Sequence, residues 1–280
     1  MSLLPVPIPN VLSIAGIDPS GGAGLLADLK TFSALGVYGC GIVTALTAQN
    51  TQAVTGIHAV PPDFLALQLD TLFADVRIDS VKIGMLANAD LIAVVASALH
   101  RHRPRFVVVD PVMVAKSGDR LLRADAIAAM KHHLLPLATV VTPNLPEAGD
   151  LVGSAITESA SDMLRAAKVL RDLGAATVLV KGGHGTGSTL VDLFHDGETT
   201  LELPASRIVT RNTHGTGCTL SSAIAARLPA ASSVTEAVRD AREYVLTAIR
   251  QADVLSVGHG HGPLHHFHAW WPARPSAQFP

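Results

Sequence analysis

The feature that most constrains the fold is a repeated alternation of short apolar runs, rich in β-branched residues, with longer segments of helical period. The runs are apolar at consecutive positions, as is usual for strands that are covered on both faces of a parallel sheet. Repetition of strand, helix and strand predicts an α/β fold, with a doubly wound, mostly parallel sheet and helices on both faces. The predicted strands are residues 11–15, 80–84, 106–110, 139–143 and 177–181.

Two segments between these strands repeat apolar residues at helical spacing. Leu25, Leu29 and Phe32 form one stripe, from which Asp28 and Lys30 are excluded, and this pattern predicts an amphipathic helix. A similar stripe runs through residues 164–173, and further helices are expected at 217–227 and 235–252.

A run at residues 189–203, interrupted by Asp196-Gly197, predicts a β-hairpin. The chain shows no internal repeat and no linker, so we expect a single domain over residues 1–280. Within it, residues 1–10 are an extended lead-in and residues 258–280 a histidine-rich tail.

Charge and composition narrow the class of partner. The 21 Lys and Arg residues nearly balance the 23 Asp and Glu residues, so the chain lacks the basic field that binding to nucleic acid or an anionic membrane needs. No apolar run is long enough for a spanning helix. Two cysteines cannot form a disulfide framework, and the proline-rich start does not resemble a secretory signal. We therefore expect a cytoplasmic protein with a small-molecule partner, no nucleic acid and no membrane.

In doubly wound folds the ligand crevice lies beyond the carboxyl ends of the strands. In this chain, the segments that follow the predicted strands are rich in glycine, polar and charged residues. These segments are residues 16–24, 110–116, 142–147 and 181–187.

The segment NTHGTGC, residues 212–218, is the strongest single signal. Gly215 and Gly217 open a helix of small residues, which allows backbone N–H groups to converge on an anion such as a phosphate. Cys218 stands at the helix start, where the helix dipole favours a thiolate. Cys40, by contrast, lies in an apolar strand-like stretch and is expected to be a small buried hydrophobe. A plain glycine loop before a helix is the alternative interpretation.

Another glycine turn, AGIDPSGGAGLLADLK at residues 15–30, follows the first predicted strand, and we call it the first glycine turn. Its glycines do not fit the dinucleotide-binding pattern, so we interpret it as a loop whose backbone faces the substrate. Asp28 lies one turn into the next helix, where it either reaches a ligand hydroxyl or occupies an exposed face.

Oxygen ligands and a lysine follow three other strands. Asn144 and Glu147, with Asp110, can organise a water-rich Mg²⁺ shell, although Asn144 can equally cap a helix. Lys181 can neutralise phosphate charge or extend out of the sheet edge. Gln49 carries a donor and an acceptor that match an aminopyrimidine edge, or it is an ordinary loop glutamine.

These motifs, with VKIGML (81–86), KGGH (181–184) and VGHGHGPLHHFHAWW (257–271), resemble the hydroxymethylpyrimidine/phosphomethylpyrimidine kinases of thiamine biosynthesis, in the ribokinase-like superfamily. The resemblance runs from about Val11 to Trp271 in the order of the family's motifs. It implies a homodimeric enzyme that uses ATP and Mg²⁺. It further implies phosphorylation of 4-amino-5-hydroxymethyl-2-methylpyrimidine, and then of the monophosphate to the diphosphate, in one site.

The resemblance also implies roles for individual residues. Gln49 pairs with the ring edge and Met85 packs on its face, while Thr47 stands where an aliphatic residue is expected. Cys218 takes the place of the aspartate base of sugar kinases, and we interpret it as the general base. The implied pyrimidine pocket is Gly16, Ala23, Asp28, Thr47, Gln49, Met85 and Val112; the phosphoryl site is Gly215, Thr216 and Gly217 with Lys181; and the Mg²⁺ site is Asp110, Asn144 and Glu147.

Two other functions remain open at this point. Pyridoxal kinase is the alternative within the kinases, because its substrate also presents a hydroxymethyl group on a flat ring. A metal-binding protein is the alternative outside them, because histidines crowd near the C-terminus without a fixed ligand spacing. These histidines are His259, His261, His265, His266 and His268.

Overall fold

The computed structural model describes residues 7–113, 124–183 and 187–271. Four segments that the sequence singled out extend beyond this part of the chain. The portions outside it are 1–6 of the lead-in, 114–116 of the segment after Asp110, 184–186 of the segment after Lys181, and 272–280 of the tail.

The described strands form one nine-stranded sheet in the order β3-β2-β1-β4-β5-β6-β7-β8-β9. From β2 to β7 all neighbours pair in parallel, while β3, β8 and β9 pair antiparallel at the two edges. The strands are β1 (Asn10–Ile17), β2 (Tyr38–Gln49), β3 (Val54–Ala59), β4 (Ser80–Ile83), β5 (Phe106–Val109), β6 (Val140–Val141), β7 (Thr177–Val180), β8 (Thr189–His195) and β9 (Thr200–Ser206).

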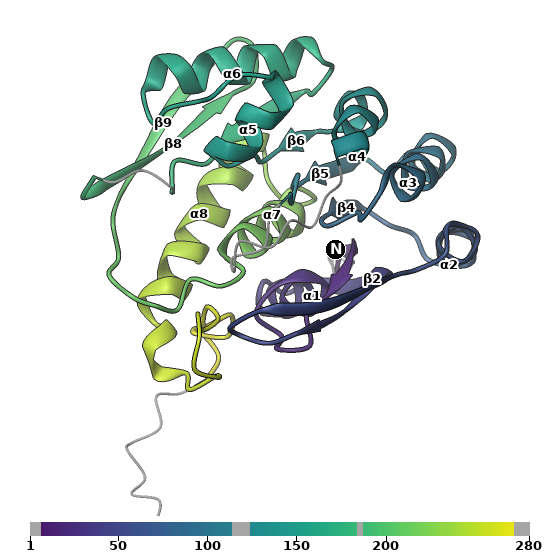
Figure 1. The fold of residues 1–280 in the computed structure, drawn as a ribbon, viewed down its shortest axis with the longest axis horizontal. Helices are drawn as coiled ribbons and strands as arrows, with labels where there is room; N and C mark the ends of the chain where they lie inside the picture. Colours follow the sequence, from purple (N-terminus) through teal and green to yellow (C-terminus); the bar gives the residue numbers. More distant parts are fainter. Residues whose placement is uncertain (1–6, 114–123, 184–186, 272–280) are drawn as a thin grey trace, which may run out of the picture.

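Helices cover both faces of this sheet (Figure 1). One layer holds α2 (Pro62–Phe73), α3 (Ala89–His102), α4 (Ala124–Ala129), α5 (Leu145–Val152) and α6 (Ala160–Asp172). The other layer holds α1 (Gly24–Ala34), α7 (Thr216–Arg227) and α8 (Val234–Arg250). The doubly wound α/β architecture predicted from the sequence is confirmed.

Side chains of the central strands alternate between the two layers, as a pleated strand requires. Val107 and Val109 pack in the layer of α2 to α6, whereas Val108 packs against α7 and α8. All three valines are fully or almost fully buried. Burial on both faces of the sheet accounts for the uninterrupted apolar runs in the sequence.

The predicted hairpin and the other four predicted strands are confirmed, but the strand predicted at residues 139–143 is shorter in the structure. Only Val140–Val141 forms β6. Pro143 has no N–H to donate to a neighbouring strand, and Asn144 already caps α5. No helix among the described residues is long and apolar enough to cross a membrane.

Candidate active site

The segments singled out in the sequence meet where the carboxyl ends of β1, β4, β5 and β7 face the start of α7. A Cβ added to Gly217 would lie 3.2 Å from Nζ of Lys181 and 3.7 Å from Oδ2 of Asp110. The glycine at the helix start therefore lies directly over the charged pair that follows β5 and β7.

The first turn of α7 is held in place by a glycine with a left-handed backbone. Gly215 has φ +78°, and a Cβ there would overlap the carbonyl oxygen of Gly22 in the first glycine turn. The N–H groups of Gly217 and Cys218 belong to the first helical turn, which has no intrahelical acceptor for them. The N–H of Thr216, in the same turn, donates to the carbonyl oxygen of Thr213 at 3.4 Å. All three residues remain partly exposed. This arrangement suits a phosphoryl group, and we call residues 215–218 the cradle.

A charged contact joins the cradle to the first glycine turn. Oδ2 of Asp18 lies 2.6 Å from Nε2 of His214, and Asp18 also accepts hydrogen bonds from the backbone N–H groups of Ser20 and Ala23. Burial acts to raise the pKa of Asp18, but the contacts with His214 and Ser20 outweigh it and hold the pKa below its ordinary value. Sequence reasoning missed this pair, because 196 positions separate two residues that no local pattern connects.

Asp110, Lys181 and Glu147 form a buried charge cluster beneath the cradle. Nζ of Lys181 lies 2.9 Å from Oδ1 of Asp110 and 3.8 Å from Oε2 of Glu147. Asp110 also accepts hydrogen bonds from the hydroxyls of Thr142 and Ser221. Despite its burial, the pKa of Asp110 is lowered by Lys181, and the two carboxylates raise the pKa of Lys181.

Glu147 differs from Asp110, because burial raises its pKa to about 7. One of its oxygens accepts from the backbone N–H of Asn144, whose side chain in turn accepts from the N–H of Glu147. This reciprocal pair is a capping box at the start of α5. The helix-cap interpretation of Asn144 is confirmed, and its carboxamide oxygen is occupied by that bond.

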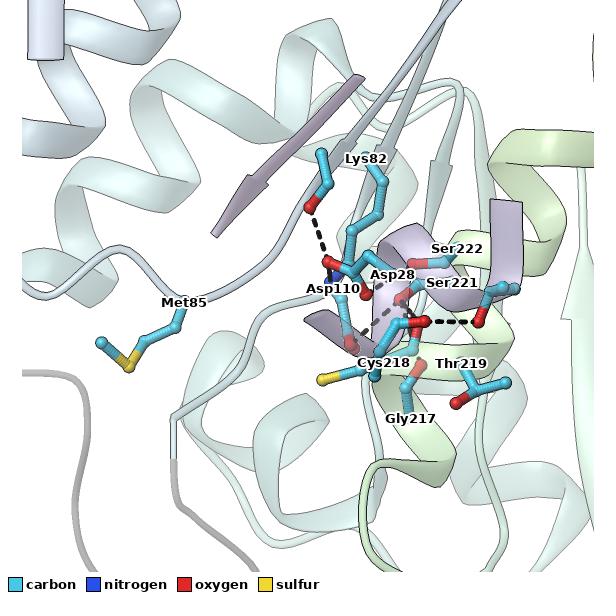
Figure 2. Close-up of polar contacts among 12 residues, drawn as sticks. Asp28, Lys82, Met85, Asp110, Gly217, Cys218, Thr219, Ser221 and Ser222 are labelled. Carbon is cyan, nitrogen blue, oxygen red and sulfur yellow. Dashed lines mark hydrogen bonds and ion pairs between the residues drawn. The ribbon is translucent and has the colours of Figure 1, made fainter. Parts of the chain in front are cut away.

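Cys218 brings its sulfur against the first glycine turn, where the backbone N–H of Gly24 interacts with it. In Figure 2 the sulfur points to the side of the site on which Met85 lies. Burial raises the pKa of the thiol to about 11, and this effect outweighs the stabilising charge of Lys82. The expectation of a ready-made thiolate at neutral pH is therefore wrong for the free protein, because desolvation exceeds the effect of the helix start.

Asp28 lies beneath the site rather than at its surface. Its side chain is fully buried, and Oδ2 accepts from the hydroxyl of Ser13 and from the ammonium of Lys82, both within 2.7 Å. Oδ1 accepts from the hydroxyl of Ser222 on α7 at 2.6 Å. Both interpretations of Asp28, as a ligand contact and as an exposed residue, are corrected: it is a buried connection between α1, β1, β4 and α7 (Figure 2).

Lys82 was missed by sequence reasoning, although a signal exists. It is a single charged residue inside the apolar run SVKIG, and in the structure it is fully buried on β4. Buried lysines need a partner, so such a residue predicts an acidic group facing it, here Asp28.

The other implied pocket residues make the following contacts. Gly16 and Met85 are in contact, since a Cβ on Gly16 would lie 3.1 Å from Cε of Met85. The hydroxyl of Thr47 lies 2.8 Å from the carbonyl oxygen of Ile17 and 3.1 Å from Oε1 of Gln49. Gln49, Ala23 and Val112 are partly exposed.

The C-terminal histidines differ in their surroundings. Among the described residues, no group of three or more His, Cys, Asp or Glu side chains is arranged to hold a metal ion. His266 is buried against Thr219 of α7, and burial lowers its pKa to about 3, while His259 and His261 are exposed.

Sequence comparison identifies relatives along nearly the whole chain. The family described as phosphomethylpyrimidine kinase matches residues 18–265. The chain is 50% identical over 262 residues to the hydroxymethylpyrimidine/phosphomethylpyrimidine kinase of Escherichia coli, covering 94% of this chain and 98% of that protein. It is 55% identical over 260 residues to the protein of the same name from Rhizobium meliloti, covering 93% and 97%.

Solved structures give the same picture of the fold. The pyridoxal kinase from Staphylococcus aureus in complex with pyridoxal superposes with a TM-score of 0.86 at 36% identity, covering 94% of this chain and 95% of that one. A phosphomethylpyrimidine kinase from Clostridium difficile superposes with a TM-score of 0.77 at 39% identity, covering 86% and 99%.

Proposed function

Because the chain belongs to the phosphomethylpyrimidine kinase family, we propose that it transfers phosphoryl groups from ATP to 4-amino-5-hydroxymethyl-2-methylpyrimidine and then to its monophosphate. These steps belong to thiamine biosynthesis. The observation that carries the proposal is the identity of 50% and 55% to two enzymes of that name over more than nine-tenths of the chain.

The cradle binds the phosphoryl group in transfer. The N–H groups of Gly217 and Cys218, with the turn at Gly215 and Thr216, donate to its oxygens. Lys181, 13% exposed just below Gly217, balances the charge that spreads over these oxygens. Phosphoryl transfer depends mainly on such positioning and charge stabilisation, because its transition state is loose.

The donor set beneath the cradle suits Mg²⁺ held partly through water. Asp110 and Glu147 are hard oxygen ligands on either side of Lys181, and Mg²⁺ prefers a few carboxylates together with water and phosphate oxygens. We propose that Asp110 and Glu147 hold the ion and that Asn144, as the cap of α5, orients Glu147. When bound, the ion supplies charge neutralisation on the phosphate oxygens.

Cys218 is the proposed acceptor of the hydroxyl proton of the substrate. A neutral thiol cannot accept a proton, so the residue acts in its thiolate form. With a pKa of about 11, that form increases about tenfold with each pH unit through the neutral and mildly alkaline range. The proton then returns from the sulfur to solvent.

The flat pyrimidine ring is proposed to bind between Met85 and the glycine turn. Gly16 and Ala23 supply backbone and a small side chain, Gln49 offers both hydrogen-bonding arms to the ring edge, and Val112 closes the apolar side. The hydroxyl of Thr47 is directed to Ile17 and Gln49, so it orients Gln49.

Pyridoxal kinase is the second candidate, favoured by one observation: pyridoxal kinases from two bacteria superpose on this chain with TM-scores of 0.86. Purified protein should be given ATP and either the aminopyrimidine alcohol or pyridoxal, and ADP formation measured for each. We expect kcat/KM to be higher for the aminopyrimidine. A higher value for pyridoxal would reverse the assignment.

We further propose that residues 1–280 form one kinase domain that works as a cytoplasmic homodimer. Apolar side chains on α2 and on the β2–β3 hairpin support an interface there: Phe64 and Leu67 are 54% and 58% exposed, and Leu46 and Ile57 are also exposed. Sedimentation of wild type and of Leu67→Glu tests it, with a dimer expected for the first and a monomer for the second.

A further inference from the structure

The histidine-rich segment near the C-terminus is a motif that the proposed function leaves without a role. We call residues 258–266 the strap. Its sequence alternates glycine with histidine over Gly258–Gly262. The side chains of His259 and His261 are exposed, while the three glycines face the rest of the protein. Residues 258–262 therefore contact the protein through their backbone.

The first end of the strap is fixed to the turn between β2 and β3. The N–H of Gly260 donates to Oγ1 of Thr51 at 3.1 Å, and the N–H of His261 donates to the carbonyl oxygen of Thr51 at 3.0 Å. A Cβ on Gly260 would overlap that same carbonyl oxygen. The strap therefore approaches Thr51 as closely as a backbone can.

The middle of the strap is fixed to the segment that leads into the cradle. The N–H of His214 donates to the carbonyl oxygen of Gly262 at 3.0 Å, and His214 also pairs with Pro263 in a parallel β-bridge. A Cβ on Gly262 would overlap Oδ1 of Asn212.

The far end of the strap is anchored on α7 and α8. His266 lies 3.1 Å from the hydroxyl of Thr219 on α7, and its carbonyl oxygen accepts from the hydroxyl of Tyr244 on α8. The N–H of His265 donates to the carbonyl oxygen of Ala248 on α8. His265 and His266 are buried, and this end of the strap packs directly against the helix that carries the cradle.

Thr51 lies two residues after Gln49, in a turn that has little freedom. The N–H of Asn50 donates to the carbonyl oxygen of Ala53, and Oδ1 of Asn50 accepts from the N–H groups of Gln52 and Ala53. Gln49 itself pairs with Val54 across the hairpin. Thr51 and Gln49 therefore lie at the same hydrogen-bonded end of the β2–β3 hairpin.

We propose that the strap is a positioning segment that sets the place of Gln49 relative to the cradle, with Gly260 and Thr51 as its positioning residues. It connects the part of the site proposed to hold the ring with the part proposed to hold the phosphoryl group. The expected change in KM rests on the proposed function, whereas the contacts between the strap and Thr51 do not depend on which substrate binds. The glycines, rather than the histidines, carry this role.

Gly260→Ala is the test variant, because its Cβ must push Thr51 away. Gly56→Ala, in the same hairpin, is the matched control, since its Cβ would lie 3.6 Å from Cβ of Ala48 in ordinary contact. We expect Gly260→Ala to raise KM for the aminopyrimidine alcohol about tenfold or more, because small misplacements of a substrate contact are costly. KM for ATP should stay within twofold, and Gly56→Ala should match wild type.

An unchanged KM for the alcohol, or an equal rise in both KM values, would overturn the proposal. Thr51→Val replaces Gly260→Ala if that variant does not fold, because it removes the acceptor of the Gly260 N–H without adding bulk. It should also raise KM for the aminopyrimidine alcohol and leave KM for ATP unchanged. His261→Ala, which alters only an exposed side chain, should leave both values unchanged.

A second measurement does not depend on the substrate. Hydrogen exchange of residues 50–53 should be faster in Gly260→Ala or Thr51→Val than in wild type and His261→Ala; equal rates would refute the connection. If wild-type protein fails to phosphorylate the aminopyrimidine, the proposed function fails, and the exchange experiment still decides whether the strap holds the turn.

Discussion

Oδ2 of Asp18 lies 2.6 Å from Nε2 of His214, and this contact joins the first glycine turn to the segment that leads into the cradle. Both side chains are buried. The same region brings the carbonyl oxygen of Gly22 against Gly215, so the two turns fit only when neither carries a Cβ at the contact. The first glycine turn and the cradle therefore pack against each other, although they come from distant parts of the chain.

Asp18→Asn should destabilise the protein in a pH-dependent way. The folded-state pKa of Asp18 is lowered, so the carboxylate stabilises the fold above its unfolded pKa of about 4, and this contribution is lost as pH falls through the lower folded value. We expect a loss of about 2 kcal/mol at pH 7. The loss is moderate because an asparagine oxygen at the Oδ2 position still accepts from the hydroxyl of Ser20 and from the N–H of Ala23.

Urea unfolding of wild type and Asp18→Asn at several pH values measures this effect. The difference in the free energy of unfolding should shrink below pH 4. A difference that stays constant down to pH 3 would show that packing, and not the charge, is responsible.

The base role of Cys218 predicts a specific pH profile. In the free enzyme the pKa of the thiol is about 11, and the pH dependence of kcat/KM reports groups of the free enzyme. We expect kcat/KM of the wild type to rise with a slope near one between pH 8 and pH 10. Cys218→Ala should lose about 10²-fold or more in kcat and should lack this slope.

Cys218→Asp is the informative companion variant. A carboxylate needs no alkaline pH to ionise, so this variant should exceed Cys218→Ala at pH 7 and show no rise above pH 8. A wild-type kcat/KM that does not change with pH, or unchanged turnover in Cys218→Ala, would remove the base role. The backbone N–H of Cys218 in the cradle would then be the contribution of this residue.

Lys82→Met should be strongly destabilising, because it leaves the carboxylate of Asp28 fully buried with two hydroxyl partners and no counter-charge. Removal of one partner of a buried ion pair costs about 3–5 kcal/mol. The double variant Lys82→Met/Asp28→Asn should recover at least half of the loss, since no charge then remains to be compensated. Chemical denaturation of the three proteins measures this, and a single variant within about 1 kcal/mol of wild type would contradict it.

Asn144→Ser separates a helix cap from a metal ligand. Serine caps about as well as asparagine, so stability should change by less than about 0.5 kcal/mol. Because the carboxamide oxygen already caps α5, the Mg²⁺ concentration for half-maximal activity should also be unchanged. Asp110→Asn should raise that concentration at least tenfold. A comparable rise in Asn144→Ser would make Asn144 a ligand after all.

Local patterns in the sequence were sufficient for the parallel strands β1, β4, β5 and β7, for the helices α1, α6, α7 and α8, for the β8–β9 hairpin and for the two glycine turns, but they gave no range for β2, β3, α2, α3 or α4. Each of the predicted elements depends on periodicity or on turn residues close together in the chain. The convergence of Asp110, Lys181 and Gly217 also followed, because the carboxyl ends of parallel strands share one edge.

Only the tertiary structure decided which polar residues face one another across the layers. Asp28 lies off the apolar stripe of its helix and is nevertheless buried, because Lys82 reaches it from β4 and Ser222 from α7. The protonation of Cys218 was decided in the same way, by burial that no local pattern records. Pairing and desolvation are properties of surroundings assembled from distant segments, whereas helix and strand periods are properties of the chain itself.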